Sequence, residues 1–140
     1  MAHWLVKSEP FKWSWEQQVA AGAKGTFWDG VRNHSAKLNL KAMRLGEQVF
    51  FYHSNEGLAV VGVVEVIREA YPDPTCGPDE PWVVVDFKAV KPFPRPVTLA
   101  EIKAEPRLAK MSLVTSMRLS VQPVTDEEWA VVSAMGGTSA

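Results

Sequence analysis

The hydrophobic positions of this chain change their spacing along the sequence, and the middle of the chain has the pattern of strands. Residues 48–54 (QVFFYHS) and 58–70 (LAVVGVVEVIREA) are rich in β-branched and aromatic residues. The segment Asn55-Glu56-Gly57 between them is typical of a hairpin turn. Gly62, inside the second strand, indicates a bulge or a close approach of another group to the backbone.

Three further strands are expected around this hairpin. Residues 82–91 (WVVVDFKAVK) predict a long strand that ends where Pro92, Pro94 and Pro96 begin. Residues 71–81, which hold four prolines and a glycine, predict a surface loop. Short strands are expected at 3–7 (HWLVK) and at 117–124 (MRLSVQPV).

Polar residues that favour helix starts precede the remaining segments. Ser14, Thr98 and Thr125 are each followed three residues later by Gln or Glu, which is the pattern of a capping box. Asn33 can cap a fourth helix. Helices are therefore expected at about 14–21, 34–44, 99–104 and 126–135. Together these elements predict an α+β domain with a curled, mostly antiparallel, barrel-like sheet flanked by helices.

Length and composition indicate one soluble globular domain, expected over residues 1–136 with a short tail at 137–140. The single cysteine, Cys76, excludes an internal disulfide and is typical of a reducing compartment. Lys7 and Glu9 interrupt the first apolar run, so no signal peptide is expected, and no apolar stretch approaches membrane-spanning length. We therefore expect a cytoplasmic protein, or a nuclear one in a eukaryote, with no membrane partner.

The formal net charge of −1 does not by itself indicate a nucleic-acid-binding protein. The charge is unevenly distributed, however: residues 1–46 carry a net charge of +4 and the remainder −5. A local basic face near the N-terminal half is therefore possible. Lys37, Lys41 and Arg44 are interpreted as solvated helix surface.

The residues typical of catalytic and metal sites do not form recognisable motifs in this sequence. His53 and Ser54 are neighbours in a predicted strand, so their side chains point to opposite faces and do not predict a catalytic pair. His3 and His34 lack metal-ligand spacing, and no phosphate-binding loop or dinucleotide fingerprint is present. We therefore expect no metal, no cofactor and no enzymatic activity.

A short segment, Trp28-Asp29-Gly30-Val31-Arg32-Asn33, has the groups needed to bind a flat polar ligand. Aromatic rings that sandwich a nucleobase, with an amide or hydroxyl at its edge, make a base pocket. Lys7 and Arg32 could contact a phosphate. The candidate walls are Trp4, Trp28, Phe51 and Tyr52, and the candidate edge-reading groups are Ser8, Asn33, Ser54, Ser120 and Gln122.

Each of these candidates also has a purely structural interpretation. Trp4 and Phe51 lie in apolar runs and are expected in the core, whereas Trp28 is expected either to face a ligand or to pack in the core. Ser8 and Glu9 lie where the first strand ends, because Pro10 follows them. In the strand expected at 117–124, the side chains of Arg118, Ser120 and Gln122 would share one face, exposed to solvent or lining a wet pocket.

Several segments together resemble the EVE domain family, in order and over nearly the whole chain. They are WLVKSEP at 4–10, WDGVRN at 28–33, FFYHSN at 50–55, VG at 61–62, YPDP at 71–74 with WVVVD at 82–86, and RLSVQPV at 118–124. The resemblance implies a PUA-like β-barrel related to YTH domains. It also implies a reader of modified bases, notably modified cytosine in DNA or a modified base in RNA.

Carried onto this sequence, the resemblance implies a composite pocket formed by four segments. Its residues would be Lys7, Ser8, Glu9, Trp28, Val31, Arg32, Asn33, Tyr52, His53, Ser54, Arg118, Ser120, Gln122 and Pro123. The leading hypothesis is a non-enzymatic reader that stacks one modified base on Trp28. A sensor of a free nucleotide-like small molecule is a second hypothesis. The third is a glycosylase or hydrolase with Glu9 or Asp29 as general acid–base.

Overall fold

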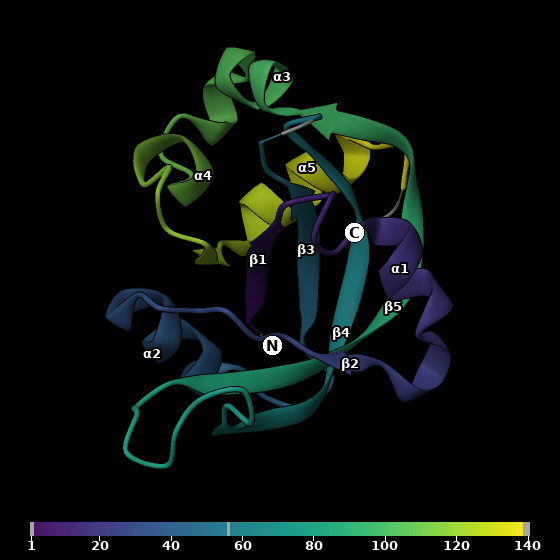
Figure 1. Cartoon of the computed structure of the whole chain (residues 1–140). Coiled ribbons are helices and arrows are strands. Elements are labelled where there is room, and N and C mark those ends of the chain that lie inside the picture. Colours follow the sequence, from purple (N-terminus) through teal and green to yellow (C-terminus); the bar gives the residue numbers. More distant parts are fainter. Residues whose placement is uncertain (1, 56, 139–140) are drawn as a thin grey trace.

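The computed structural model describes residues 2–55 and 57–138, which form one curled sheet with helices on both of its faces (Figure 1). The strands are β1 (His3–Ser8), β2 (Thr26–Phe27), β3 (Gln48–His53), β4 (Ala59–Pro72), β5 (Val83–Thr98) and β6 (Val121–Val124). The helices are α1 (Trp15–Ala20), α2 (His34–Ala42), α3 (Leu99–Ala104), α4 (Ser112–Thr115) and α5 (Asp126–Met135). Two short 3₁₀ helices are η1 (Gly22–Lys24) and η2 (Pro106–Leu108).

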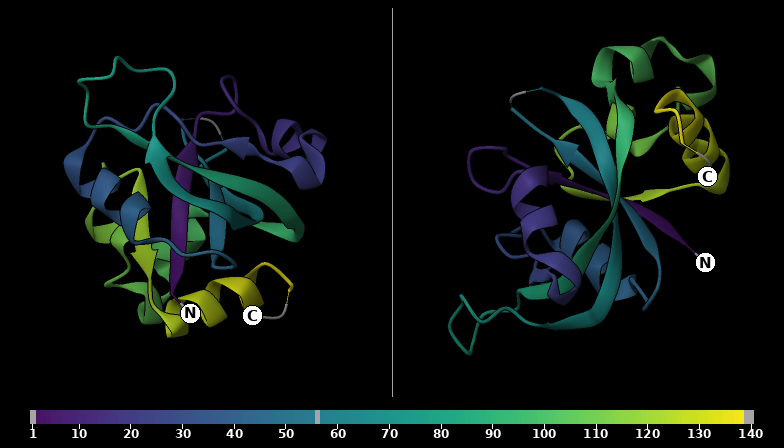
Figure 2. Two further views of the ribbon diagram at one scale, coloured as in Figure 1. Left: turned by 90° about the horizontal axis from the view of Figure 1, so that it is seen from below. Right: turned by 90° about the vertical axis from the view of Figure 1, so that its right-hand side faces the viewer.

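The strands lie in the order β2-β5-β4-β3-β1-β6. All neighbours are antiparallel except β1 and β3, which pair in parallel. The long strands β4 and β5 curve together around the molecule, which gives the sheet its curled shape (Figures 1 and 2). The predicted α+β class with a curled, mostly antiparallel sheet is confirmed.

The central hairpin of β3 and β4 forms as predicted, with Glu56 of its turn outside the described residues. Both interpretations of Gly62 are confirmed. The register of β4 against β5 shifts between Val60 and Gly62, which is a bulge. A Cβ added to Gly62 would also lie 2.5 Å from the ring of Trp15, so only a glycine leaves room for this indole here.

The prediction that three prolines end the third long strand is wrong, because β5 continues to Thr98. Pro92 pairs with Gly62 and Val97 pairs with Val60, so residues 93–96 have only Val61 opposite them. Such a bulge needs few backbone donors from the bulged strand, and the missing N–H groups of the prolines therefore cost little. The proline segment bends β5 rather than ending it.

The strand expected at 117–124 is also shorter, since β6 begins only at Val121. The Gln122 side chain is buried and its Nε2 donates to the carbonyls of Ser112, Ser116 and Leu119, at 3.3, 3.1 and 2.9 Å. These bonds hold α4 and the turn after it against β6. Arg118 and Ser120 lie in that turn, so they do not form one polar stripe with Gln122.

All three predicted capping boxes are present, at Ser14 and Gln17, Thr98 and Glu101, and Thr125 and Glu128. Asn33 caps α2 as expected, its Oδ1 accepting from the amide of Ala36 at 2.9 Å. The α2 helix ends at Ala42, two residues earlier than predicted. The helices expected at 99–104 and 126–135 have the predicted bounds at both ends.

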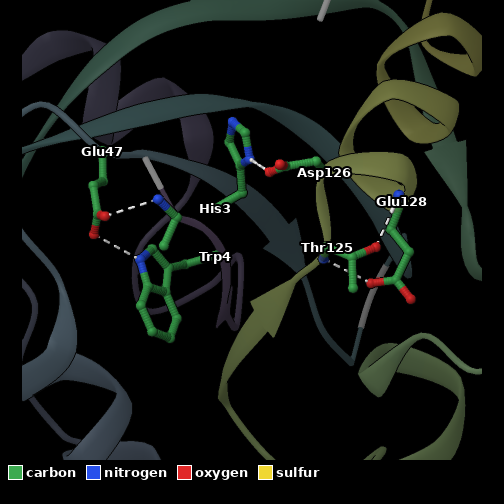
Figure 3. Close-up of polar contacts among 7 residues, drawn as sticks. His3, Trp4, Glu47, Thr125, Asp126 and Glu128 are labelled. Carbon is green, nitrogen blue, oxygen red and sulfur yellow. Dashed lines mark hydrogen bonds and ion pairs between the residues drawn. The ribbon is translucent and has the colours of Figure 1, made fainter.

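The first strand is fastened at its start by polar contacts to two other parts of the chain (Figure 3). The buried carboxylate of Glu47 accepts from the indole Nε1 of Trp4 and the amide of Ala2, both at 2.9 Å. Burial alone would raise the pKa of Glu47, but these bonds and one from the Arg44 amide hold it below its usual range. On the other side, His3 contacts Asp126 at the start of α5, with 3.1 Å between Nδ1 and Oδ1.

Because side chains alternate along a strand, the sheet separates two hydrophobic cores. The first core lies under α1 and α2 and contains Trp4, Trp15, Trp28, Phe51 and Phe87, with other apolar residues. The second core lies under α3, α4 and α5. It contains Leu5, Phe50, Tyr52, Ile102 and Trp129, with other apolar residues.

Candidate functional site

A cavity of about 520 Å³ opens where β1 ends, between the following turn and the segment that contains β2. It is lined by Lys7, Ser8, Glu9, Lys12, Trp13, Thr26, Phe27, Trp28, Asp29 and Gly30. Two other surface hollows, of about 450 and 430 Å³, are also present in the described part of the chain. Only the first combines three aromatic side chains with charged and hydroxyl groups, so it is the candidate site.

Backbone hydrogen bonds bring three of the predicted segments together at this end of the sheet. The amide of Lys7 donates to the carbonyl of Ser120 at 2.9 Å. The amide of Ser54 donates to the carbonyl of Ser8 at 2.8 Å. The ends of β1 and β3 and the turn before β6 therefore meet at this end of the sheet.

Trp28 lies at the boundary between the cavity and the first core. Its backbone amide donates to the carbonyl of Val85 at 2.9 Å, which fixes the segment that follows β2. Its ring meets Phe51 and Phe87 edge to face, at centroid distances of 5.4 and 5.6 Å. The residue is only 7% exposed. A small part of the Trp28 surface therefore faces the cavity, and most of the residue packs in the first core.

Two other aromatic residues of the cavity, which sequence reasoning did not select, are more accessible. Phe27 is 38% exposed and belongs to the edge strand β2. Trp13 is half-buried, and its indole Nε1 donates to Oε1 of Gln18 at 2.8 Å. Four more lining residues were also absent from the predicted set: Lys12, Thr26, Asp29 and Gly30. Asp29 and Gly30 belong to the selected segment at 28–33, and the signal for the turn was the aromatic and basic run Phe11-Lys12-Trp13 directly after Pro10.

The polar groups of the cavity are held by local contacts. The hydroxyl of Ser8 donates to the carbonyl of Trp13, which ties the turn to the strand. Lys12 and Glu9 form an ion pair with 3.4 Å between Nζ and Oε2. The ammonium of Lys7 donates to the carbonyl of Met117, and burial lowers the pKa of Lys7. The Glu9 carboxylate and the Ser8 hydroxyl thus belong to residues that line the opening, whereas the Lys7 ammonium lies on the face of Tyr52.

Val31, Arg32 and Asn33 continue from the cavity toward α2. Val31 is buried in the first core. The Nη1 of Arg32 donates to Oδ2 of buried Asp73 at 3.2 Å and to the carbonyl of Val31 at 3.0 Å. The Oδ1 of Asn33 is used as the cap of α2. These contacts orient the guanidinium while its side chain remains 41% exposed.

Tyr52 and His53 lie on opposite faces of β3. Tyr52 is buried in the second core, and Lys7 Nζ lies 5.8 Å from its ring centroid. His53 is on the side of the first core, where its Nε2 accepts from the amide of Trp15 at 3.1 Å. The sheet therefore places Tyr52 and Trp28 in different cores and does not bring them together as facing walls.

The remaining predicted residues lie on the second-core side or on the surface. Ser54 follows β3 and is half-buried, as is Ser120. Arg118 and Pro123 are exposed, and Pro123 pairs with Trp4 in the sheet register. Gln122 uses its amide nitrogen for α4 and the adjoining turn, as described above. Of the fourteen predicted residues, Lys7, Ser8, Glu9 and Trp28 are among those that line the cavity.

Within residues 2–55 and 57–138, no group of three or more His, Cys, Asp or Glu side chains is arranged to hold a metal ion. In the same described ranges, no helix is both long and apolar enough to cross a membrane.

Several solved structures have the same architecture. A protein from Agrobacterium tumefaciens superposes with a TM-score of 0.97 at 58% sequence identity, over 99% of this chain and 94% of that one. The human THYN1 protein, solved in complex with 5-methylcytosine-containing DNA, gives a TM-score of 0.89 at 36% identity, over 100% of both chains. A YTH domain from Zygosaccharomyces rouxii, at 14% identity and a TM-score of 0.58 over 99% of this chain and 88% of that one, shares the fold. The PUA-like fold that the sequence implied is confirmed.

Sequence comparison leads to the same group of proteins. Human thymocyte nuclear protein 1 is 38% identical over 165 aligned residues, which cover 96% of this chain and 73% of the human protein. The EVE domain model matches residues 2–135. This chain therefore belongs to the EVE domain family.

Proposed function

We propose that this protein is a non-catalytic reader that holds one modified base of a nucleic acid, with modified cytosine in DNA as the first candidate. The observation that carries the proposal is the meeting of aromatic rings and polar side chains around one cavity at the end of β1. A volume of about 520 Å³ falls within the usual range for small-ligand sites, ~300–1,000 Å³. The 36% identical human THYN1 protein, bound to 5-methylcytosine-containing DNA, supports this choice of ligand.

In this proposal the aromatic residues have different roles, according to how exposed each one is. Phe27 and Trp13 offer the accessible ring surface for stacking, and Trp28 forms the floor against the first core. Ser8 and Glu9 are placed to meet the polar edge of the base. Lys7 and the oriented guanidinium of Arg32 would contact phosphates, so binding should weaken as salt is raised.

Fluorescence anisotropy with labelled oligonucleotides tests the proposal. Single strands that carry 5-methylcytosine should bind more tightly than the same strands with cytosine. Replacement of Phe27 by alanine should weaken binding of the modified strand about tenfold, because loss of one stacked base contact costs ~1–3 kcal/mol. Val90→Ala is the matched control, since Val90 is a similarly exposed strand residue (41%) on β5, outside the cavity lining given above.

Equal binding of modified and unmodified strands by the wild-type protein would refute the reader function. Two other results would support the alternative functions, a small-molecule binder or a base-processing enzyme. A free modified nucleoside that binds as tightly as the strand would identify a small-molecule binder. Release of free base during incubation, followed by chromatography and abolished in Glu9→Gln, would identify a base-processing enzyme.

A further inference from the structure

The turn that follows β1 carries an apolar side chain far into solvent. Phe11 is 67% exposed, the highest exposure among the large hydrophobic residues in the described ranges. The turn protrudes from the body of the molecule, as both views of Figure 2 show. Its neighbours Glu9, Lys12 and Trp13 line the cavity, so Phe11 stands at the rim of the candidate site. An exposed phenyl ring at the mouth of a binding cavity requires a functional explanation more than a scattered surface leucine does.

The turn is held in shape by several hydrogen bonds. The carbonyl of Glu9 accepts from the amides of Lys12 and Trp13, at 2.9 and 3.0 Å. The hydroxyl of Ser8 donates to the carbonyl of Trp13 at the far side of the turn. Pro10 restricts the backbone directly before Phe11. The Phe11 ring therefore projects from a rigid turn. A side chain that inserts between stacked bases needs such a rigid backbone.

A base inside a duplex is not accessible to a cavity in a protein, so it must first leave the stack. Its departure leaves a gap, and proteins that deform DNA commonly insert an apolar side chain such as Phe or Leu between base steps. We propose that Phe11 is such a wedge: it enters the duplex beside the base that the cavity holds. This inference rests on the proposed function and extends it, because it assigns double-stranded nucleic acid as a substrate.

The charge next to Phe11 is compatible with this role. The Lys12 ammonium lies 5.9 Å from the centroid of the Phe11 ring, and its side chain is 70% exposed. The ion pair with Glu9 keeps it beside the turn. A cation within one residue of an intercalating ring is placed to meet the phosphates that flank the opened step.

The test compares single and double strands that carry the same modified cytosine, with wild-type protein and Phe11→Ala. Phe11→Ala should lose about tenfold or more in affinity for the duplex, because the cost of unstacking one step is no longer offset. Its affinity for the modified single strand should stay unchanged, since no stack has to be opened. Phe11→Leu should recover part of the duplex binding. Leu38→Ala on α2, where the side chain is 61% exposed, should alter neither affinity.

A fluorescent base analogue next to the modified cytosine gives a second readout. Wild-type protein should raise its emission in the duplex as the step unstacks, and Phe11→Ala should raise it less. Unchanged duplex affinity and emission in Phe11→Ala would overturn the wedge, as would an equal loss on both strand forms. If the wild-type protein fails to prefer the modified single strand, the reader function itself falls, and the wedge falls with it.

Discussion

The two hydrophobic cores, on opposite faces of one sheet, use tryptophan differently. In the second core, Trp129 stacks flat on Phe50 at a centroid distance of 3.8 Å and an interplanar angle of 10°. In the first core, Trp28 meets Phe51 and Phe87 edge to face, at 88° and 75°. Phe50 and Phe51 are neighbours on β3, so one dipeptide supplies the partner ring to both cores.

The difference in geometry corresponds to a difference in surroundings. Three helices cover the second core, and His3 also stacks on Trp129, at a centroid distance of 4.3 Å. The first core continues into the cavity, because Trp28 belongs to both and Trp13 packs against it. A closed stack contributes stability alone, whereas an edge-on ring beside an opening can contribute to stability and to binding.

Removal of each indole should separate the roles of the two cores with the largest effect. Trp129→Ala should lower the free energy of unfolding by ~3–5 kcal/mol, because a large buried ring leaves a cavity. The folded fraction should still bind modified strands with wild-type affinity. Trp28→Ala should lose a similar amount of stability and, in addition, its preference for the modified base.

Urea unfolding followed by circular dichroism measures the first quantity, and anisotropy at a temperature where each variant remains folded measures the second. Loss of base preference in folded Trp129→Ala would show that the second core also shapes the site. Retention of full affinity in folded Trp28→Ala would remove Trp28 from the site and leave Phe27 and Trp13 as its aromatic residues.

The elements that the sequence predicted well depend on local interactions. Each capping box joins residues only three positions apart, and the β3–β4 hairpin joins adjacent segments, so both are visible in the chain itself. The course of β5 past Pro92 depends on the bulge opposite Val61, and the shortness of β6 depends on the bonds from Gln122 to α4 and the turn after it. Such pairings become visible only when distant segments are in place.

The candidate site was predictable to a similar extent. Lys7, Ser8, Glu9 and Trp28 line the cavity, and their segments were selected because each breaks the pattern of a regular element. Tyr52 was grouped with Trp28, although the alternation along β3 already assigns Tyr52 to the face of Phe50 rather than that of Phe51. Phe27 was missed because the pairing of β2 with β5 brings it to the rim, and two residues carry too little pattern to predict a strand.

Two glycines, one beside each core, allow smaller changes in packing to be tested. A methyl group on Gly62 would meet the Trp15 ring in the first core, and one on Gly136 would meet the Phe93 ring in the second. Gly62→Ala should cost ~1–3 kcal/mol of unfolding free energy, because the sheet on either side of Gly62 cannot yield. Gly136→Ala should cost less, since the residue follows the last helix, α5, and can shift.

Binding separates these two variants more clearly than stability does. Trp15 follows Trp13 and Ser14 in the chain, so displacement of its ring in Gly62→Ala should also weaken binding of the modified strand. Gly136→Ala should bind as the wild-type protein does. Equal binding by both variants would mean that the cavity tolerates movement of the first core.

The smallest expected effect is a dependence of stability on pH that arises on the first-core side of the sheet. Burial lowers the pKa of His53 below its ordinary value of 6.5, although the carboxylate of Glu16 partly opposes the shift. The neutral ring is required, because Nε2 accepts from the Trp15 amide. Above about pH 6.5 the ring is neutral in both states, and its contribution to stability is complete.

As the pH falls through 6.5 toward the lower native pKa, the unfolded chain binds a proton that the native protein does not, and stability decreases. Urea unfolding from about pH 7.5 to about pH 5.5 should therefore show a smaller decrease for His53→Gln than for the wild-type protein. Between about pH 7.5 and 8.5 the difference in stability between the two proteins should stay constant, which serves as the internal control. Equal decreases in the acidic range would mean that the His53 ring accepts a proton in the folded protein as readily as in the unfolded chain, and that the bond from Trp15 does not keep it neutral.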